Sequence, residues 1–183
     1  MLMPRRPVPA LSVPTLTHGG YLLTSETPQN FTLVVFYRGL HCPICKTYVS
    51  ELDKLVAEFA TRGVGIQVLS SDTRERAEAA RDNWGLANLN LGYGLSIEMA
   101  RSWDLYVSTS RGKTSAGIEE PALFSEPGLF LIKPDNSVYF ASVQTMPFAR
   151  PHFDDILGAI DFVLAKDYPA RGEIENLKTV RAA

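Results

Sequence analysis

Hydrophobic positions in the first half of the chain alternate between two kinds of pattern. Phe31–Tyr37 is an unbroken β-branched and aromatic run, which is typical of a central strand buried on both faces. From Lys46 the apolar residues recur at three- and four-residue steps, which predicts an amphipathic helix that ends at Gly63. Val64–Leu69 then predicts a second buried strand.

The middle of the chain predicts two more helices. Asp72 with Glu75 three residues later resembles a capping box, which would open a helix that ends near Trp84. Ser96 opens a shorter helix that runs to Trp103, and both tryptophans have apolar neighbours that favour a place in the core. The polar stretch 108–120 has no period, so we expect an irregular loop there.

The last third of the chain predicts a hairpin and a closing helix. Gly128–Ile132 and Val138–Val143 flank the turn sequence Pro-Asp-Asn, which favours two antiparallel strands. A final helix is expected from about His152 to just before Pro169. Its inward face would carry Phe153, Ile156, Leu157, Ile160 and Leu164.

This order of elements predicts an α/β domain with parallel core strands, an antiparallel hairpin and flanking helices. Right-handed crossovers place the ends of parallel strands and the starts of the following helices at one rim, where sites usually form. We divide the chain into an N-terminal arm with an entry strand (1–30), the domain itself (31–168) and a C-terminal tail (169–183).

Composition narrows the class of protein. The chain has 183 residues, 45% of them hydrophobic, and 18 basic against 20 acidic residues give a net charge of −2. The composition excludes fibrous and disordered classes of protein. The nearly neutral charge argues against nucleic acid as a partner. No apolar run reaches the roughly 18–20 residues of a membrane span. Four prolines in the first 14 residues favour an extended arm over a signal peptide.

The chemistry is concentrated in one tetrapeptide. The chain has two cysteines, Cys42 and Cys45, separated by Pro43 and Ile44 just after the first strand. They are too few for a secreted disulfide framework, so we expect a cytoplasmic protein. Proline suits the first position of a helix, which makes Cys42 the N-cap and Cys45 the third helical residue.

This placement favours a reactive thiol pair. Free N–H groups and the helix dipole stabilise a sulfur anion at the N-cap. Lowering a cysteine pKa from about 8.5 to about 6.5 raises the thiolate fraction at pH 7 from roughly 3% to roughly 75%. Residues three apart share a helix face, so Cys42 and Cys45 can close a disulfide without unfolding the helix.

Two structural alternatives compete with redox chemistry. The cysteines could be core residues, but their tie to a proline at a strand-to-helix turn argues against this. They could form half of a zinc site. Such a site needs four ligands, and the chain offers only the scattered His18, His41 and His152. We therefore expect no metal and no cofactor.

At this point the sequence resembles the peroxiredoxin-like branch (alkyl hydroperoxide reductase and thiol-specific antioxidant) of the thioredoxin superfamily, which implies a thioredoxin-like fold. The resemblance covers roughly residues 32–168 and rests on the order and spacing of several short segments. They are Phe36-Tyr37, Leu69-Ser-Ser-Asp72, Leu95–Tyr106, Gly128-Leu-Phe-Leu-Ile132 and Met146-Pro-Phe-Ala-Arg150.

The resemblance assigns roles to residues but leaves the nucleophile open. In the family's Pro-x-x-x-Thr-x-x-Cys register, Arg38 stands at the proline, Cys42 at the threonine and Cys45 at the peroxidatic cysteine. Arg150 matches the arginine that points at the catalytic cysteine. No cysteine follows Cys45 to act as the usual C-terminal resolving residue. In a thioredoxin-type register Cys42 is the nucleophile instead, and helix-cap electrostatics also favour it.

Pro127 and His41 complete the candidate site. Glu126-Pro127 before the Gly-Leu-Phe strand resembles the cis-proline that faces the cysteines in thioredoxins. Arg38 and His41 are nearer to the cysteines in sequence than Arg150 is. We expect Cys42, Cys45 and Arg150 to be catalytic, and Pro127, Arg38 and His41 to bind substrate.

These assignments imply an antioxidant oxidoreductase that reduces hydroperoxides through the CxxC pair. A thioredoxin- or glutaredoxin-type reductant would recycle it. The alternatives are a thioredoxin-like oxidoreductase acting on protein disulfides, and a non-catalytic redox sensor or scaffold. We expect no nucleic-acid or membrane partner, and the resemblance leaves room for a homodimer.

Overall fold

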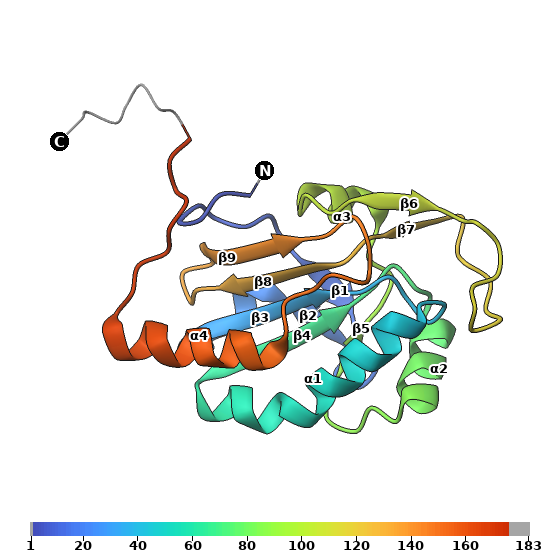
Figure 1. Ribbon diagram of the computed structural model, residues 1–183, viewed down its shortest axis with the longest axis horizontal. Helices are drawn as coiled ribbons and strands as arrows, with labels where there is room; N and C mark the ends of the chain where they lie inside the picture. Colours follow the sequence, from blue (N-terminus) through green and yellow to red (C-terminus); the bar gives the residue numbers. More distant parts are fainter. Residues whose placement is uncertain (1, 176–183) are drawn as a thin grey trace.

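The computed structural model describes residues 2–175 and is built on one central sheet (Figure 1). Its five strands lie in the order β5 (Leu91–Gly92), β4 (Val64–Leu69), β3 (Phe31–Phe36), β8 (Gly128–Ile132) and β9 (Val138–Val143). β3, β4 and β5 are parallel, whereas β8 runs antiparallel to β3 and β9 runs antiparallel to β8. This mixed sheet confirms the predicted fold class and the predicted hairpin.

Helices cover one face of the sheet and the N-terminal arm covers the other. α1 (Pro43–Thr61), α2 (Arg74–Trp84) and α4 (Phe153–Lys166) pack on the first face. The opposite face packs against the β1–β2 hairpin (Ser12–Pro14 and Gly20–Leu22), the short η1 helix (Leu23–Ser25) and α3 (Ile97–Ser102). A separate pair, β6 (Val107–Thr109) and β7 (Leu123–Ser125), lies beyond α3.

The side chains of β3 show why the sheet is buried on both sides. Leu33 and Val35 enter the core under α1 and α4, and Val34 and Phe36 enter the core on the opposite face. All six residues of the strand are buried. The continuous apolar run therefore serves two cores, because successive strand residues point to opposite faces. Trp84 and Trp103 lie in these two cores, as predicted.

Four details of the sequence analysis were wrong or incomplete. Thr73, not Asp72, caps α2. Leu164 is 42% exposed, because α4 turns that position away from the sheet near its C-terminal end. The stretch 108–120 is not wholly irregular, since its first two residues belong to β6, which pairs with β7, and Lys113 forms an isolated bridge with Glu119. The arm contributes a β-hairpin rather than one entry strand. Residues 176–183 of the predicted tail, like residue 1, lie outside the described residues.

Strand register brings four separate segments to one rim of the sheet. β3 and β4 both end there, so the segments that lead into α1 and α2 meet. β8 starts opposite the end of β3, with Gly128 beside Phe36, and β9 ends opposite Gly128 at Val143. Residues 126–127 and 144–150 therefore lie beside the cysteines. In residues 2–175, no helix is long and apolar enough to cross a membrane.

Candidate active site

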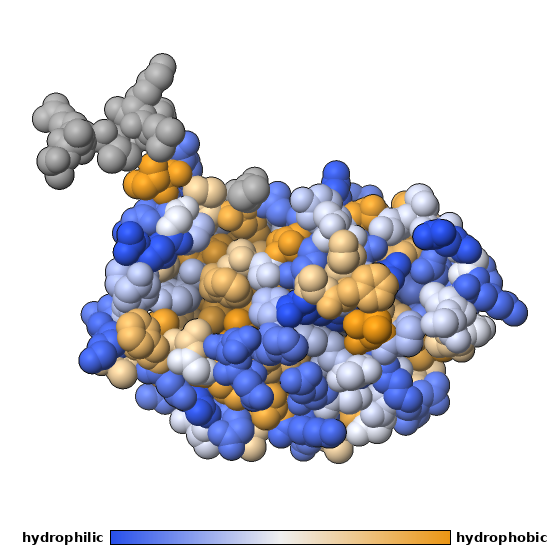
Figure 2. All heavy atoms as spheres, in the orientation of Figure 1, coloured by the Kyte–Doolittle hydropathy of each residue, from blue (hydrophilic) through white to orange (hydrophobic). Residues whose placement is uncertain are grey.

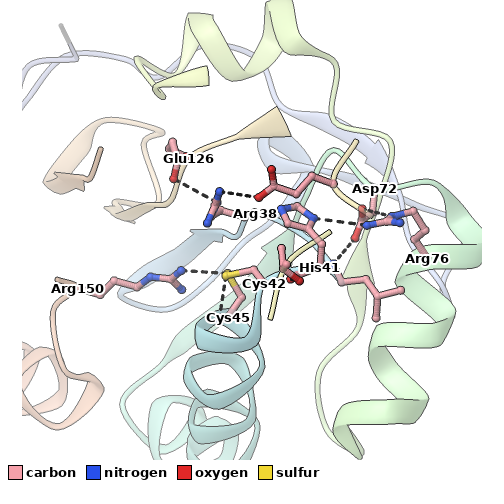
Figure 3. Close-up of a disulfide and its surroundings, with 11 residues drawn as sticks. Arg38, His41, Cys42, Cys45, Asp72, Arg76, Glu126 and Arg150 are labelled. Atoms are coloured by element: carbon pink, nitrogen blue, oxygen red, sulfur yellow. Dashed lines mark hydrogen bonds and ion pairs between the residues drawn. A yellow bond between two sulfur atoms is a disulfide. The ribbon is translucent and has the colours of Figure 1, made fainter. Parts of the chain in front are cut away.

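The two cysteines form a disulfide in the first turn of α1 (Figure 3). Cys42 is the N-cap, Pro43 is the first helical residue, and the two Cα atoms are 5.2 Å apart. The Cys45 N–H donates a hydrogen bond of 3.2 Å to the Cys42 Sγ. The exposed fraction is 1% for Cys42 and 0% for Cys45. The predicted cap is confirmed, and the pair is buried.

Arg150 reaches Cys45 from the segment between β9 and α4. Its Nη2 donates to the Cys45 Sγ at 3.0 Å, and its guanidinium lies over the Tyr48 ring at 4.8 Å. The Tyr48 hydroxyl in turn donates to the Pro151 carbonyl at 2.8 Å, which fixes the end of this segment. The predicted proximity of Arg150 to the cysteines is confirmed.

The Arg150 guanidinium has no carboxylate partner in the described part of the chain. Its Nε and Nη1 are buried and find no hydrogen-bond partner within residues 2–175. Burial lowers the pKa of Arg150 to about 10, which still leaves it charged at neutral pH. A buried positive charge without an ion-pair partner in residues 2–175 thus lies against the Cys45 sulfur.

Arg38 has the opposite environment. It pairs with Glu120 at 3.3 Å and with Glu126 at 3.4 Å, and it lies over the Phe124 ring at 4.7 Å. Glu126 also accepts a hydrogen bond of 2.6 Å from the Ser108 hydroxyl. Two carboxylates therefore neutralise Arg38, and Arg150 is left as the charge that faces the cysteines (Figure 3).

His41 is fully buried rather than lying at an open rim. Its ring packs against Phe124 with centroids 4.7 Å apart, and its Nδ1 lies 3.4 Å from Arg76 Nη2. A guanidinium can only donate, so Nδ1 is the acceptor and the ring proton lies on Nε2. Burial and the nearby Arg38 lower the pKa of His41 to about 4, so the ring is neutral. Its role toward substrate stays a prediction.

The turn before the cysteines is held by residues to which the sequence analysis gave no role at the site. The Asp72 carboxylate accepts from the Leu40 N–H at 2.6 Å and from Arg76 Nε at 2.7 Å. The Thr114 hydroxyl donates to the His41 carbonyl at 2.7 Å. Gly39 sits over Asp72 with a φ of +137°, a conformation that favours glycine. The only advance signal was the position of Asp72 three residues after the last residue of β4.

Pro127 differs from the prediction. The described residues contain no cis peptide bond, so the Glu126–Pro127 bond is trans and the expected cis-proline is absent. A trans proline fits because β8 begins directly at Gly128 and the chain enters the strand in extended form. Pro127 is buried, and its carbonyl accepts from the Gln144 N–H at 3.0 Å. It thereby anchors the segment that carries Arg150.

A family model of the AhpC/TSA family matches residues 4–141. The chain belongs to the AhpC/TSA family. No curated protein matches it. Membership and fold agree on an oxidoreductase, a thiol-dependent peroxidase, with a CxxC pair at disulfide distance.

Solved structures similar to this AhpC/TSA protein are peroxiredoxins. The peroxidoxin BcpB from Mycobacterium tuberculosis has 17% identity and a TM-score of 0.69, covering 89% of this chain and 99% of its own. The reduced 2-Cys peroxiredoxin of Plasmodium vivax has 18% identity and a TM-score of 0.73, covering 91% and 84%. A yeast mitochondrial 1-Cys peroxiredoxin has 19% identity and a TM-score of 0.71, covering 91% and 78%. At these identities the likeness shows the fold.

Residues 2–175 bring together no group of three His, Cys, Asp or Glu side chains that could hold a metal ion.

Proposed function

We propose that the reduced protein reduces hydroperoxides with Cys45 as the attacking thiolate and Cys42 as the resolving thiol. The observation that carries this assignment is the contact of 3.0 Å between Arg150 and the Cys45 Sγ. Helix-cap electrostatics alone favour Cys42. The guanidinium adds a full charge to the Cys45 side, whereas the N-terminus of a helix provides about half a charge.

The magnitude of the arginine effect supports this choice. A hydrogen bond to a charged group stabilises it by about 1.5–3 kcal/mol, which corresponds to a lowering of the cysteine pKa by about one to two units. The helix terminus contributes typically about 0.3–1 kcal/mol, and about 2 kcal/mol in buried geometries. Arg150 is in addition the group that can stabilise negative charge on the departing peroxide oxygen.

The proposed reaction proceeds in two steps. The Cys45 thiolate attacks one oxygen of the hydroperoxide. The O–O bond breaks, the departing oxygen takes up a proton and leaves as an alcohol or water, and Cys45 becomes a sulfenic acid. The Cys42 thiol then attacks the Cys45 sulfur and loses its proton, and the sulfenic oxygen leaves as water. The product is the disulfide seen in the structure.

Resolution needs no unfolding of α1. Cys42 and Cys45 occupy the N-cap and third position of the same helical turn, and their Cα atoms are 5.2 Å apart in the disulfide. This distance lies inside the ordinary range for disulfides. The second cysteine therefore replaces a resolving residue later in the chain.

A thioredoxin- or glutaredoxin-type protein is the proposed reductant, since the disulfide must take up two electrons in each cycle. The yeast mitochondrial 1-Cys peroxiredoxin has a thiol resolving mechanism that runs via glutathione and thioredoxin systems. We place the protein in a reducing compartment such as the cytoplasm, where these thiol systems operate. Arg38, His41 and Pro127 are proposed to shape the peroxide site.

Stopped-flow mixing of the reduced protein with hydrogen peroxide tests the activity. We expect a second-order rate constant of about 10⁴ M⁻¹s⁻¹ or more, as for efficient enzymes. Mass spectrometry after one equivalent of peroxide should show the loss of two hydrogens in the peptide that contains Cys42 and Cys45. A rate no faster than that of a free thiol such as glutathione would contradict the proposal.

Exchange with protein disulfides is the second candidate, and one observation favours it. Cys42 caps α1, and its sulfur accepts a hydrogen bond from the Cys45 N–H. A cysteine in this position at a helix N-terminus has the geometry of the attacking thiolate in disulfide exchange. The trans Pro127 and the position of Arg150 at the other sulfur argue for the peroxidase instead. Reduction of insulin disulfides by the dithiol protein, with no fast peroxide reaction, would favour the exchange enzyme.

A further inference from the structure

The buried disulfide raises the question of how a reductant recognises it. Both sulfurs lie beneath the surface, with side-chain exposures of 1% and 0%. Of the residues between them, Ile44 is 39% exposed and projects outward from the first turn of α1. A protein that reduces the disulfide must therefore bind to the surface around Ile44 before its reactive sulfur can approach Cys42 or Cys45.

Residues 145–150, which we call the covering segment, reach the first turns of α1 through Arg150 at Cys45 and the adjoining Pro151 at Tyr48. The segment is held at one end by the hydrogen bond from the Gln144 N–H to the Pro127 carbonyl, and at the other by that from Tyr48 to Pro151. Between these anchors, Arg150 turns inward to the Cys45 sulfur. The segment is thus attached to the disulfide directly.

The covering segment presents apolar side chains outward. Phe148 is 73% exposed, more than any other large apolar side chain in residues 2–175, and Met146 is 48% exposed. Figure 2 shows apolar side chains gathered on this face, where the chain passes between β9 and α4. Exposed apolar groups of this size that lie together typically mark an interaction site.

Two unpaired cations border the same surface. Lys46 follows Cys45 directly, is exposed, and makes no ion pair within residues 2–175. Arg111 is exposed and likewise has no carboxylate partner for its side chain among those residues. It lines a cavity of about 490 Å³ together with Thr145 and Met146, and the two carboxylates of that cavity, Glu120 and Glu126, are largely buried and paired with Arg38. An apolar centre with basic edges fits a partner with an apolar centre and acidic edges.

From this arrangement we infer that the covering segment and Ile44 form the docking surface for a protein dithiol. The reactive cysteine of this reductant would lie in an apolar surface edged by carboxylates. The inference rests on the proposed function, because it names the partner of the same disulfide. The occupant is a dithiol protein because the surface lies over a bond that has to be reduced in every cycle.

The docked partner would attack Cys42. In thiol–disulfide exchange the better leaving group is the thiolate with the lower pKa, and Arg150 stabilises the thiolate of Cys45. The reductant thiolate bonds to the Cys42 sulfur while the Cys42–Cys45 bond breaks and Cys45 leaves as a thiolate. The second thiol of the reductant then loses its proton and attacks the first sulfur of the reductant, which is bonded to Cys42 in the mixed disulfide. Cys42 leaves as a thiolate that takes up a proton, and the reductant ends as a disulfide.

Substitution of Phe148 by serine tests the docking surface. The matched control is Phe162→Ser on α4, where the native phenylalanine is 54% exposed. The oxidised proteins are mixed with reduced thioredoxin, regenerated by its reductase and NADPH, and separately with dithiothreitol. We expect Phe148→Ser to lower the rate constant with thioredoxin by about tenfold, as an interface anchor worth about 1.4 kcal/mol would. The rate constant of the control with thioredoxin, and those of both variants with dithiothreitol, should stay within about twofold of the wild-type values.

Several outcomes would overturn the docking surface. One is an unchanged rate of Phe148→Ser with thioredoxin, and another is an equal loss with dithiothreitol, which would show a structural defect. A third is a wild-type protein that thioredoxin reduces no faster than dithiothreitol does. The peroxide step is measured separately on dithiothreitol-reduced protein. A slow reaction with peroxide in that measurement would contradict the proposed function. The rates of reduction by thioredoxin would still decide the docking surface, because they are measured on the oxidised protein without peroxide.

Discussion

Replacing Arg150 by glutamine removes the charge that faces Cys45 while keeping a polar side chain with N–H donors. The contact at 3.0 Å is worth about 1.5–3 kcal/mol to a thiolate, so the Cys45 pKa should rise by about one to two units. For a thiolate with a pKa near 6.5, a rise of 1.5 units lowers its fraction at pH 7 from roughly 75% to roughly 10%. The lost stabilisation of the departing oxygen adds a further factor, so the rate constant with peroxide should fall about 10²-fold or more.

The assay has two readouts and a control. Ultraviolet absorbance of the thiolate against pH gives the cysteine pKa, and stopped-flow mixing with hydrogen peroxide gives the rate constant. Arg74→Gln, on the exposed surface of α2, serves as the matched loss of an arginine. If Arg150→Gln titrates like the wild-type protein and keeps its rate, the assignment of Arg150 to the site is wrong.

The same variant makes a second, opposite prediction for stability. In the oxidised protein the Arg150 guanidinium is buried and uncompensated, so its removal should leave the free energy of unfolding unchanged or higher. In the reduced protein it should lower that free energy, because an attractive interaction with the thiolate is lost. Thermal unfolding of both redox forms checks the difference. An equal loss of stability in both forms would mean that Arg150 acts only through packing.

Three further predictions concern the turn before the cysteines. Because burial lowers the pKa of His41 from 6.5 to about 4, its neutral form contributes stability that is present above pH 6.5 and is lost as the pH falls toward 4. His41→Phe should therefore reduce the slope of unfolding free energy against pH in this window, by up to about 1.4 kcal/mol per pH unit, and an unchanged slope would refute the assignment. Gly39→Ala should destabilise the protein by about 2 kcal/mol or more in urea denaturation, because its Cβ would lie 2.7 Å from an Asp72 oxygen. Gly85→Ala, which also has positive φ but open space, should cost only about 1 kcal/mol, and equal losses would contradict the role of Asp72. Thr114→Val should leave the loop around residue 114 folded but slow the peroxide reaction a fewfold, because the His41 carbonyl loses its hydrogen bond. Stopped-flow rates identical to those of the wild-type protein would contradict the role of Thr114 in holding His41.

The central part of the fold follows from local patterns. The apolar run of β3 and the period of α1 each arise from neighbouring residues that share one environment, so hydrophobicity alone identifies them. The cap at Cys42 is equally local, because Pro43 can start a helix but cannot continue one. The chemistry of the cysteine pair was therefore visible before any tertiary contact was known.

The rest of the site depends on contacts between distant parts of the chain. Arg38 pairs with Glu126, and Thr114 supports His41, only because strand register brings four segments to one rim. No local signal separates such a paired arginine from an unpaired one. Local spacing is also misleading at Asp72. Its distance from Glu75 in sequence fits a capping box, yet its carboxylate accepts hydrogen bonds from the Leu40 N–H and the Arg76 side chain.

The sequence could not decide between the two cysteines as nucleophile, and the position of Arg150 supplies the argument for Cys45. The most direct test uses Cys42→Ser and Cys45→Ser, each reduced and treated with one equivalent of hydrogen peroxide in the presence of a sulfenic-acid reagent. Mass spectrometry should find the label on Cys45 in Cys42→Ser and little label in Cys45→Ser. Label on Cys42 alone, or on neither cysteine, would contradict the assignment.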